Sequence, residues 1–383
     1  VIQTHETNAL GGTDHTYSHL TFTGKPLQVM QVHTTADTTM TDVYSYTYDN
    51  MERLLTASVS HDGAAAVTLA QNTYNELGQL ASQQLGIAAS PSSGGTEGGF
   101  IEYAYNVRGW TTAISNPNFW QTLHYQDAFS NATPCYNGNI SSMKWRWNNT
   151  NSGHGYTFTY DDRDRLTSAN HTLYNMSTAP SCYSEQMTYN RNSAITSLTR
   201  TGNGASNAGN MDILSYSYTG NKLQNIYDWG ISNVYDGIFE FVSNTISSSG
   251  NRYTYNSAGD LIQDANKGLS LIEYDLFGHP RRIQHHNGNV TEYVYAATGE
   301  KLRTKHTTAV EGLSVPLGQT LELTDNETMD VDSVDYWGNL RITKEDIVTH
   351  HGVVGMTYQF GGGYFAVTPQ PYRPPHSTAV GVQ

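Results

Sequence analysis

Charged residues are scarce in this 383-residue chain, at 14% of the composition, against about 25% in an average soluble protein. Lys and Arg total 20, whereas Asp and Glu total 34, so the formal net charge is −14. A protein that binds nucleic acid needs a basic face to neutralise phosphates, and binding to an anionic membrane surface needs one as well. We therefore expect neither nucleic acid nor an anionic lipid surface as a partner.

The chain also lacks long apolar runs and has few cysteines. No run approaches the ~20 apolar residues of a transmembrane helix, so no membrane span is expected. The two cysteines, Cys135 and Cys182, are too few to staple a chain of this size, and they lack the spacing of a zinc site. They form either one disulfide or two small buried thiols.

Tyrosine and glycine are abundant instead, with 27 and 35 residues. Tyr and Thr favour strands, while Gly and Asn favour tight turns. The chain is 37% hydrophobic and 11% aromatic, which is enough apolar surface for a folded core. The composition predicts an all-β protein with little helix.

An internal repeat organises most of the sequence. Its pattern is Tyr-[Asp/Asn]-x-x-Gly-x-[Leu/Ile], as in Tyr74 to Leu80 and Tyr255 to Leu261. Further copies begin at Tyr48, Tyr105, Tyr160, Tyr189 and Tyr274, with a looser copy at Tyr295, a shorter one at Tyr218 and a degenerate one near Tyr125. The spacing between copies varies, which indicates a fixed turn joined by loops of variable length.

Each copy is predicted to form a β-hairpin. Aromatic residues alternate before the turn, as in Tyr44, Tyr46 and Tyr48, and this period of two places them on one face of a strand. The Asp or Asn can bond the backbone two residues on, and the Gly supplies a positive φ, a role that we assign to Asn192 and Asp164 where Gly is missing. Because a lone hairpin is unstable, about ten hairpins are expected to pair into one long antiparallel ribbon of about twenty strands. The residues predicted to shape these turns are Tyr48, Asp49, Tyr74, Gly78, Tyr105, Gly109, Tyr160, Asp161, Tyr189, Tyr255, Gly259, Tyr274, Asp275, Gly278, Tyr295 and Gly299.

The sequence shows no convincing catalytic, cofactor or metal site. The pairs His285-His286 and His350-His351 are poor chelators, because adjacent residues on a strand point to opposite faces. The acidic cluster from Asp161 to Asp164 sits in one turn, whereas a glycosidase needs two carboxylates that face each other across a bond. We expect a protein that is not an enzyme.

The repeat resembles the YD repeat of RHS proteins, which are related to the repeats of teneurins. Three further stretches resemble the RHS-repeat proteins of Bacteroidota: Phe22 to Leu27, Tyr136 to Ile140 and Asp335 to Asn339. The resemblance implies that the ribbon coils into a hollow shell, partial cocoon or barrel, and that such a shell encloses a toxin for delivery to a competitor cell. It also implies a secreted or cell-surface protein, whose partners are an enclosed polypeptide cargo, a neighbouring shell domain or further copies of itself.

The repeat divides the chain into four expected parts: an N-terminal lead-in over 1–19, the hairpin ribbon over 20–311, a degenerate repeat segment over 312–367, and an extended Pro-rich tail over 368–383.

Two other functions stay open. Unpaired strand edges would suit an extracellular protein that assembles into fibres or oligomers. A carbohydrate-binding adhesin would use exposed aromatic rings that stack on sugars, although the same rings serve cross-strand packing. The tryptophans that could bind glycans in this way are Trp110, Trp120, Trp145, Trp147, Trp229 and Trp337.

Overall fold

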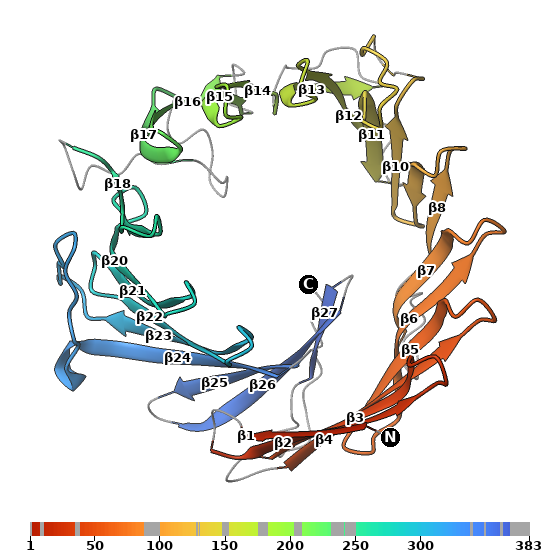
Figure 1. The fold of residues 1–383 in the computed structure, drawn as a ribbon, viewed down its shortest axis with the longest axis horizontal. Coiled ribbons are helices and arrows are strands. Elements are labelled where there is room, and N and C mark those ends of the chain that lie inside the picture. The colour runs from red at the N-terminus through yellow and green to blue at the C-terminus, as the bar shows by residue number, and fades with distance from the viewer. Residues whose placement is uncertain are drawn as a thin grey trace. The chain divides into compact units, whose positions relative to one another are not determined.

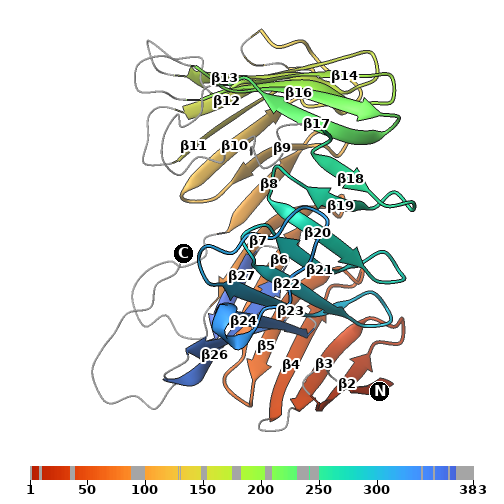
Figure 2. The same cartoon turned by 90° about the vertical axis from the view of Figure 1, so that its left-hand side faces the viewer.

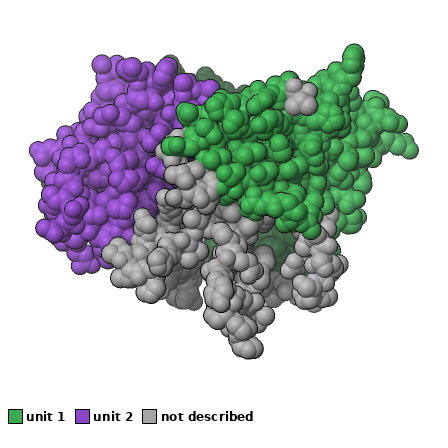
Figure 3. Space-filling model, turned by 90° about the horizontal axis from the view of Figure 1, so that it is seen from below, with its two compact units in different colours: residues 1–243 green, residues 244–383 purple. Residues whose placement is uncertain are grey.

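The protein is described by a computed structural model over residues 2–7, 11–34, 39–87, 100–127, 129, 131–147, 153–174, 183–202, 209–230, 241, 250–337, 340–347, 350–360 and 363–367. Within these ranges the structure is built of β-strands, and helix is limited to one short 3-10 turn, Asp325–Glu327. No helix of the described part is long and apolar enough to cross a membrane. The chain divides into two compact units, residues 1–243 and residues 244–383 (Figure 3).

Unit 1 is a single antiparallel ribbon in which every strand pairs with its neighbours in chain order (Figure 1). Figure 2 shows β2 to β5 lying side by side in this order. The strands are β1 (Ile2–Thr7), β2 (Thr13–Leu20), β3 (Pro26–Thr34), β4 (Thr39–Tyr48), β5 (Leu54–His61), β6 (Val67–Tyr74), β7 (Leu80–Ile87), β8 (Ile101–Tyr105), β9 (Thr111–Ser115), β10 (Phe119–His124), β11 (Ser142–Trp147), β12 (Gly153–Tyr160), β13 (Leu166–Tyr174), β14 (Glu185–Tyr189), β15 (Ile195–Thr201), β16 (Asn210–Thr219) and β17 (Lys222–Asp228).

Unit 2 repeats the same plan in a shorter ribbon, again with antiparallel neighbours in chain order. Its strands are β18 (Tyr253–Tyr255), β19 (Leu261–Asp264), β20 (Leu269–Tyr274), β21 (Pro280–His285), β22 (Val290–Tyr295), β23 (Lys301–Ala309), β24 (Thr328–Trp337), β25 (Leu340–Ile347), β26 (His350–Phe360) and β27 (Gly363–Val367). Among the described residues the two sheets hold 17 and 10 strands, which is more than the twenty expected, because several hairpins lack the tyrosine motif.

The all-β prediction and the antiparallel ribbon of hairpins are confirmed. The structure also shows strands β1 and β2 inside the segment expected as a lead-in. The Pro-rich tail over 368–383 lies outside the described residues, and the four-part division stays a prediction.

Strands are joined alternately at the two edges of each ribbon. The repeat turns all lie at one edge, where they join β4 to β5, β6 to β7, β8 to β9, β12 to β13 and β14 to β15 in unit 1. The connections β5–β6 and β9–β10 lie at the other edge. The ribbon therefore has one edge of uniform turns and one edge of varied loops.

Side chains alternate between the two faces of the sheet along each strand, and one of these faces is well buried. On β4, Tyr44 and Asp42 are 3% and 0% exposed, and their cross-strand partners on β5 are Val59 and His61. Buried carboxylates on this face are paired, as a buried charge requires. Asp42 Oδ1 lies 2.7 Å from His61 Nδ1.

In unit 2, residues 312–324 leave β23 and cross over β20 and β21. Val315, which is buried, donates its N–H to the His286 carbonyl at 2.8 Å, and its own carbonyl accepts from Ser270 Oγ at 2.8 Å. Leu321 N–H donates to Gln284 Oε1 at 2.9 Å. Ser270 and Gln284 are fully buried, so this segment satisfies polar groups on the face that it covers.

Candidate functional site: the edge of repeat turns

The seven-residue repeat turns share one register, whereas the shorter copy pairs Tyr218 with Leu223. We number the residues of the seven-residue turn one to seven, from the tyrosine to the Leu or Ile. Position one pairs directly with position seven, as in Tyr74↔Leu80 and Tyr160↔Leu166, and the register shifts by one residue beside the tyrosine. This is the geometry of a hairpin with a bulge at the end of the ladder.

An oxygen at position two organises the turn. Asp49 Oδ1 accepts the N–H groups of Met51 and Arg53, both at 2.9 Å. The Asp49 N–H donates to the Arg53 carbonyl at 3.0 Å, and the Glu52 N–H donates to the Asp49 carbonyl at 2.9 Å. The same side-chain bonds recur at Asn75, Asn106, Asp161, Asn190 and Asp275.

Position five has a positive φ, which explains the glycine of the motif. Gly78 has φ 82°, and the residues that replace glycine keep this conformation: Glu52 at 60°, Asp164 at 61° and Ser193 at 65°. The assignment of this role to Asn192 is corrected, because Ser193 is the fifth residue of that copy. Asp164 is confirmed.

Positions two and six interact across the turn. Arg165 Nε donates to Asp161 Oδ2 at 2.7 Å, and Arg53 Nε donates to Asp49 Oδ2 at 2.6 Å. The side-chain hydrogen bond from Arg165 lowers the pKa of Asp161 to about 2. The carboxylates of Asp49 and Asp161 are therefore ionised and shape their turns.

The tyrosine at position one connects each turn to the one before it. Its hydroxyl donates to the carbonyl that ends the preceding turn, which in most copies is that of the seventh residue. These bonds run from Tyr48 to Pro26 (2.8 Å), Tyr74 to Leu54 (2.9 Å), Tyr105 to Leu80 (2.9 Å), Tyr125 to Thr111 (2.8 Å), Tyr160 to Ile140 (2.8 Å), Tyr189 to Leu166 (2.6 Å), Tyr218 to Ile195 (2.8 Å) and Tyr274 to Leu261 (2.7 Å). We call this series the tyrosine ladder.

Burial affects several hydroxyls of the ladder. It raises the pKa of Tyr105 and of Tyr189, for example, above the ordinary value for tyrosine. Phenylalanine would fill the same space, but it could not make the bond. The ladder explains why the repeat carries tyrosine.

The residue at position six covers the next tyrosine ring. The Arg53 guanidinium carbon lies 4.6 Å from the centre of the Tyr74 ring, and Arg165 lies 4.6 Å from that of Tyr189. Such cation–π contacts add about 0.5–1 kcal/mol each at exposed sites. A single side chain thus closes its own turn and contacts the next one.

Two turns have the same hydrogen bonds without the tyrosine. In Leu20 to Pro26, Thr21 Oγ1 replaces the carboxylate and accepts the Lys25 N–H at 3.0 Å, with Gly24 at φ 91°. In Gln284 to Val290, the His285 N–H donates to the Asn289 carbonyl at 2.8 Å. In the sequence, the first of these turns is indicated only by the resemblance of the stretch that begins at Phe22. The His285-His286 pair is considered there only as a metal site, and its turn is not predicted.

The predicted turn residues all lie at hairpin turns. Tyr255 pairs with Leu261 and Gly259 has φ 99°, while Gly109, Gly278 and Gly299 have φ between 80° and 86°. The looser copy at Tyr295 closes by backbone bonds alone, because its second residue is Ala296. The degenerate copy at Tyr125 keeps its place on the ladder but opens into a longer loop up to β11.

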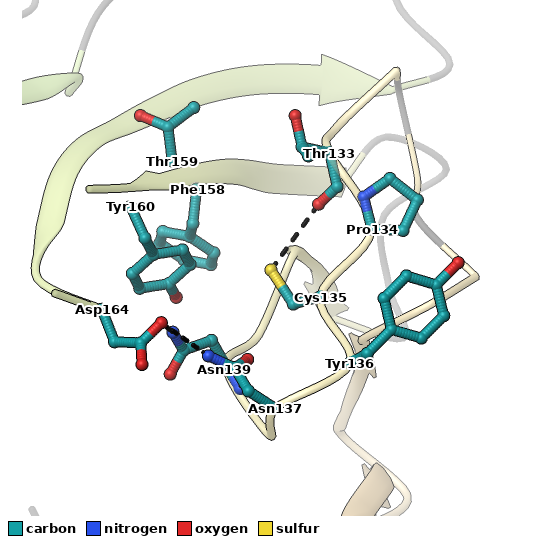
Figure 4. Close-up of a pocket in the computed structure, with 10 residues that line it drawn as sticks. All are labelled: Thr133, Pro134, Cys135, Tyr136, Asn137, Asn139, Phe158, Thr159, Tyr160 and Asp164. Carbon is teal, nitrogen blue, oxygen red and sulfur yellow. Dashed lines mark hydrogen bonds between the residues drawn. The ribbon is translucent and has the colours of Figure 1, made fainter. Parts of the chain in front are cut away.

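That loop contains a pocket of about 340 Å³ (Figure 4), lined by Thr133, Pro134, Cys135, Tyr136, Asn137, Asn139, Phe158, Thr159, Tyr160 and Asp164. Asp164 Oδ1 accepts from Asn137 Nδ2 at 2.7 Å, and Cys135 Sγ donates to the Thr133 carbonyl at 3.6 Å. Burial and then the charge of Asp164 raise the pKa of the Cys135 thiol, which disfavours the nucleophilic thiolate. Cys182 lies outside the described residues, so a disulfide with Cys135 stays a prediction.

The tryptophans proposed for glycan binding are spread over the chain. Trp145 stacks against His154 and Tyr156 of the neighbouring strand, with ring centres 5.3 and 5.5 Å away. Trp147 and Trp229 are largely exposed, at 55% and 72%. The glycan hypothesis is not tested by this arrangement.

Comparison with known proteins found no matching family model and no matching curated protein. Among solved structures, TcdB2-TccC3 with Cdc42 matches at a TM-score of 0.59 and 15% identity over 96% of this chain, and TcdB2-TccC3 matches at 0.58 and 15% over 94%. The Photorhabdus luminescens Tc holotoxin pore gives 0.49 and 14% over 91%. The chain spans 19% of the length of each of these chains. Together with the repeat geometry, the two TcdB2-TccC3 matches support an RHS-like fold for this chain.

Proposed function

We propose that this chain is a non-enzymatic wall segment of an RHS-type secreted protein of Bacteroidota, and that the complete shell encloses a polypeptide toxin for delivery to a competitor cell. The observation that carries the proposal is the uninterrupted ribbon in each unit, in which every hairpin is joined to its neighbour. The match to TcdB2-TccC3 with Cdc42 supports the proposal, because it covers 96% of this chain but 19% of the other chain. A segment of a longer wall is expected to match a complete wall in this way.

The chemistry of the turns supports a wall rather than a catalyst. The carboxylates of the repeat, such as those of Asp49 and Asp161, already accept hydrogen bonds from backbone N–H groups of their own turn and from the side chain at position six. The half-buried thiol of Cys135 has a raised pKa, which disfavours the reactive thiolate. These side chains hold the ribbon together.

Protection from protease tests the enclosure. The native gene product that contains residues 1–383 is treated with a broad-specificity protease, and mass spectrometry follows its segments over time. A wall function predicts that a segment other than the repeats stays intact while the ribbon is folded and is digested after urea unfolds it. A control in which Gly259→Val weakens one turn should lose this protection at a lower urea concentration. Digestion of all other segments at the rate of an unfolded peptide would refute enclosure.

A further inference from the structure

A row of exposed apolar side chains lies along the turn edge of unit 1. It consists of Phe22, Met51, Leu77, Val107 and Tyr136, whose exposed fractions are 107, 75, 81, 102 and 66%. The first four are the third or fourth residue of successive repeat turns, and Tyr136 occupies the loop that replaces the next turn. We call these residues the tip row.

Contacts between neighbouring turns make the tip row continuous. Lys25 Nζ donates to the Glu52 carbonyl of the next turn, and Thr23 Oγ1 bonds Glu52 Oε1 at 2.5 Å. Arg108 Nη1 donates to the Tyr136 carbonyl at 2.6 Å. The apolar side chains therefore belong to one edge, spaced two strands or about 9.6 Å apart.

The turn itself does not require apolar tips. The next turns of the same edge have Asp162 and Arg163 in one copy, and Arg191 and Asn192 in another, at the equivalent positions. They pack as well as the apolar turns do: Arg163 Nη1 donates to the Arg191 carbonyl at 2.7 Å. The exposed apolar side chains of the tip row thus have no role in folding, and apolar side chains gathered along one edge mark an interaction site.

We propose that the tip row is a self-association surface through which two copies of this chain meet about a two-fold axis. Two identical rows share one period, so an antiparallel arrangement can place every tip against a tip of the other copy. Phe22 and Tyr136 can bury roughly 150 Å² each or more, and Met51, Leu77 and Val107 add to this towards the ~800 Å² that each partner contributes to a standard interface.

Charge supports a second copy as the occupant. The chain as a whole carries −14 and repels its copies. In the first four turns of the tip row, however, Lys25, Arg53 and Arg108 balance Asp49, Glu52 and Glu76. Two acidic chains can therefore approach along this row without a net like-charge repulsion. The contact is made by side chains, since the turn backbone is already hydrogen-bonded, and it therefore differs from pairing between open strand edges.

Sedimentation velocity over a wide concentration range at physiological salt tests the proposal. The unmodified chain should show a monomer–dimer equilibrium, and the double variant Met51→Glu with Leu77→Glu should raise the dissociation constant at least tenfold. The matched control is Leu276→Glu with Phe277→Glu, which places the same charges on exposed turn tips of unit 2 and should change the constant less than twofold. Circular dichroism and urea midpoints check that both variants fold.

A cross-link locates the contact. In a Cys135→Ser, Cys182→Ser background, Leu77→Cys should form a disulfide-linked dimer on mild oxidation, because the middle tip lies nearest the axis, whereas Phe277→Cys should not. A chain that stays monomeric at all concentrations, or a dimer that the unit 2 control weakens as much as the tip variant does, would overturn the proposal. Binding of the tip row only to a different protein would also overturn it. The proposal does not depend on the enclosure of a toxin.

Discussion

Removal of a single ladder hydroxyl should destabilise unit 1 measurably. Tyr105 and Tyr103 are two residues apart on β8 and are both half-buried, but only Tyr105 donates to a carbonyl, that of Leu80 at 2.9 Å. Within the described part of the chain, the Tyr103 hydroxyl has no such partner. Tyr105→Phe and Tyr103→Phe are therefore a matched pair that differs in one hydrogen bond.

The expected effect follows from the cost of the lost bond. A net hydrogen bond contributes about 0.5–1.5 kcal/mol, and an unsatisfied carbonyl costs about 1–3 kcal/mol. Because Leu80 is only half-buried, we expect Tyr105→Phe to lower the free energy of unfolding by about 1 kcal/mol. For a unit of 243 residues this corresponds to a fall in Tm of about 2–4 °C. Tyr103→Phe should change the free energy by less than about 0.5 kcal/mol.

Urea unfolding followed by circular dichroism, together with calorimetry that separates the transitions of the two units, gives both values. Tyr189→Phe provides an independent repeat at another step of the ladder, where the bond to Leu166 is 2.6 Å long. Equal stability of the Tyr105 and Tyr103 variants would show that the ladder packs its rings without gaining from its hydroxyls.

Three further predictions concern the turns. Gly78→Val should cost about 1–3 kcal/mol, because φ is 82° and the new Cβ would lie 3.1 Å from a neighbouring side-chain nitrogen, whereas Ser257→Ala at an exposed turn should be neutral; equal urea midpoints would contradict this. Since the pKa of Asp161 is lowered to about 2 in the folded chain, its stabilising contribution should be complete above the unfolded pKa of about 3.9 and should be lost as the pH falls towards 2. An NMR titration of its side-chain carbon with a midpoint near 4 would refute the ion pair with Arg165. Cys135 should react with a thiol reagent more slowly at neutral pH than a free cysteine does, because its pKa is raised, and its rate should rise with pH to a midpoint above that of glutathione; a midpoint below it would contradict the effect of burial.

The turns were predictable because their chemistry is local. Asp49 and Gly78 act on backbone groups within four residues, so the seven-residue pattern reveals both their place and their role. The turn that begins at Leu20 does not match the seven-residue pattern, because a hydroxyl of Thr21 replaces the carboxylate at position two. The turn that begins at Gln284 does not match the pattern either, because it is closed by backbone hydrogen bonds after His285.

The ladder was not predictable from the sequence in the same way. Tyr125 reaches Thr111 across 14 residues, while Tyr105 reaches Leu80 across 25, so no fixed spacing marks the donor and the acceptor. The division near residue 243 was equally hidden, because the repeat continues on both sides of it. Long-range links of this kind become visible only when the strands are paired in space.

The alternation of uniform turns with varied loops has a consequence for how such a chain can evolve. The strands pair with their neighbours in chain order, and every ladder bond joins two successive hairpins. A whole hairpin can therefore be duplicated or deleted while the donor of the next hairpin finds an equivalent acceptor one step away, as expected for quasi-one-dimensional repeat proteins. Loops at the opposite edge can change length without breaking a single ladder bond. Genes for such ribbons should therefore gain and lose sequence in units of one hairpin. The turns at one edge should stay constant, while the loops at the other edge vary in length and sequence.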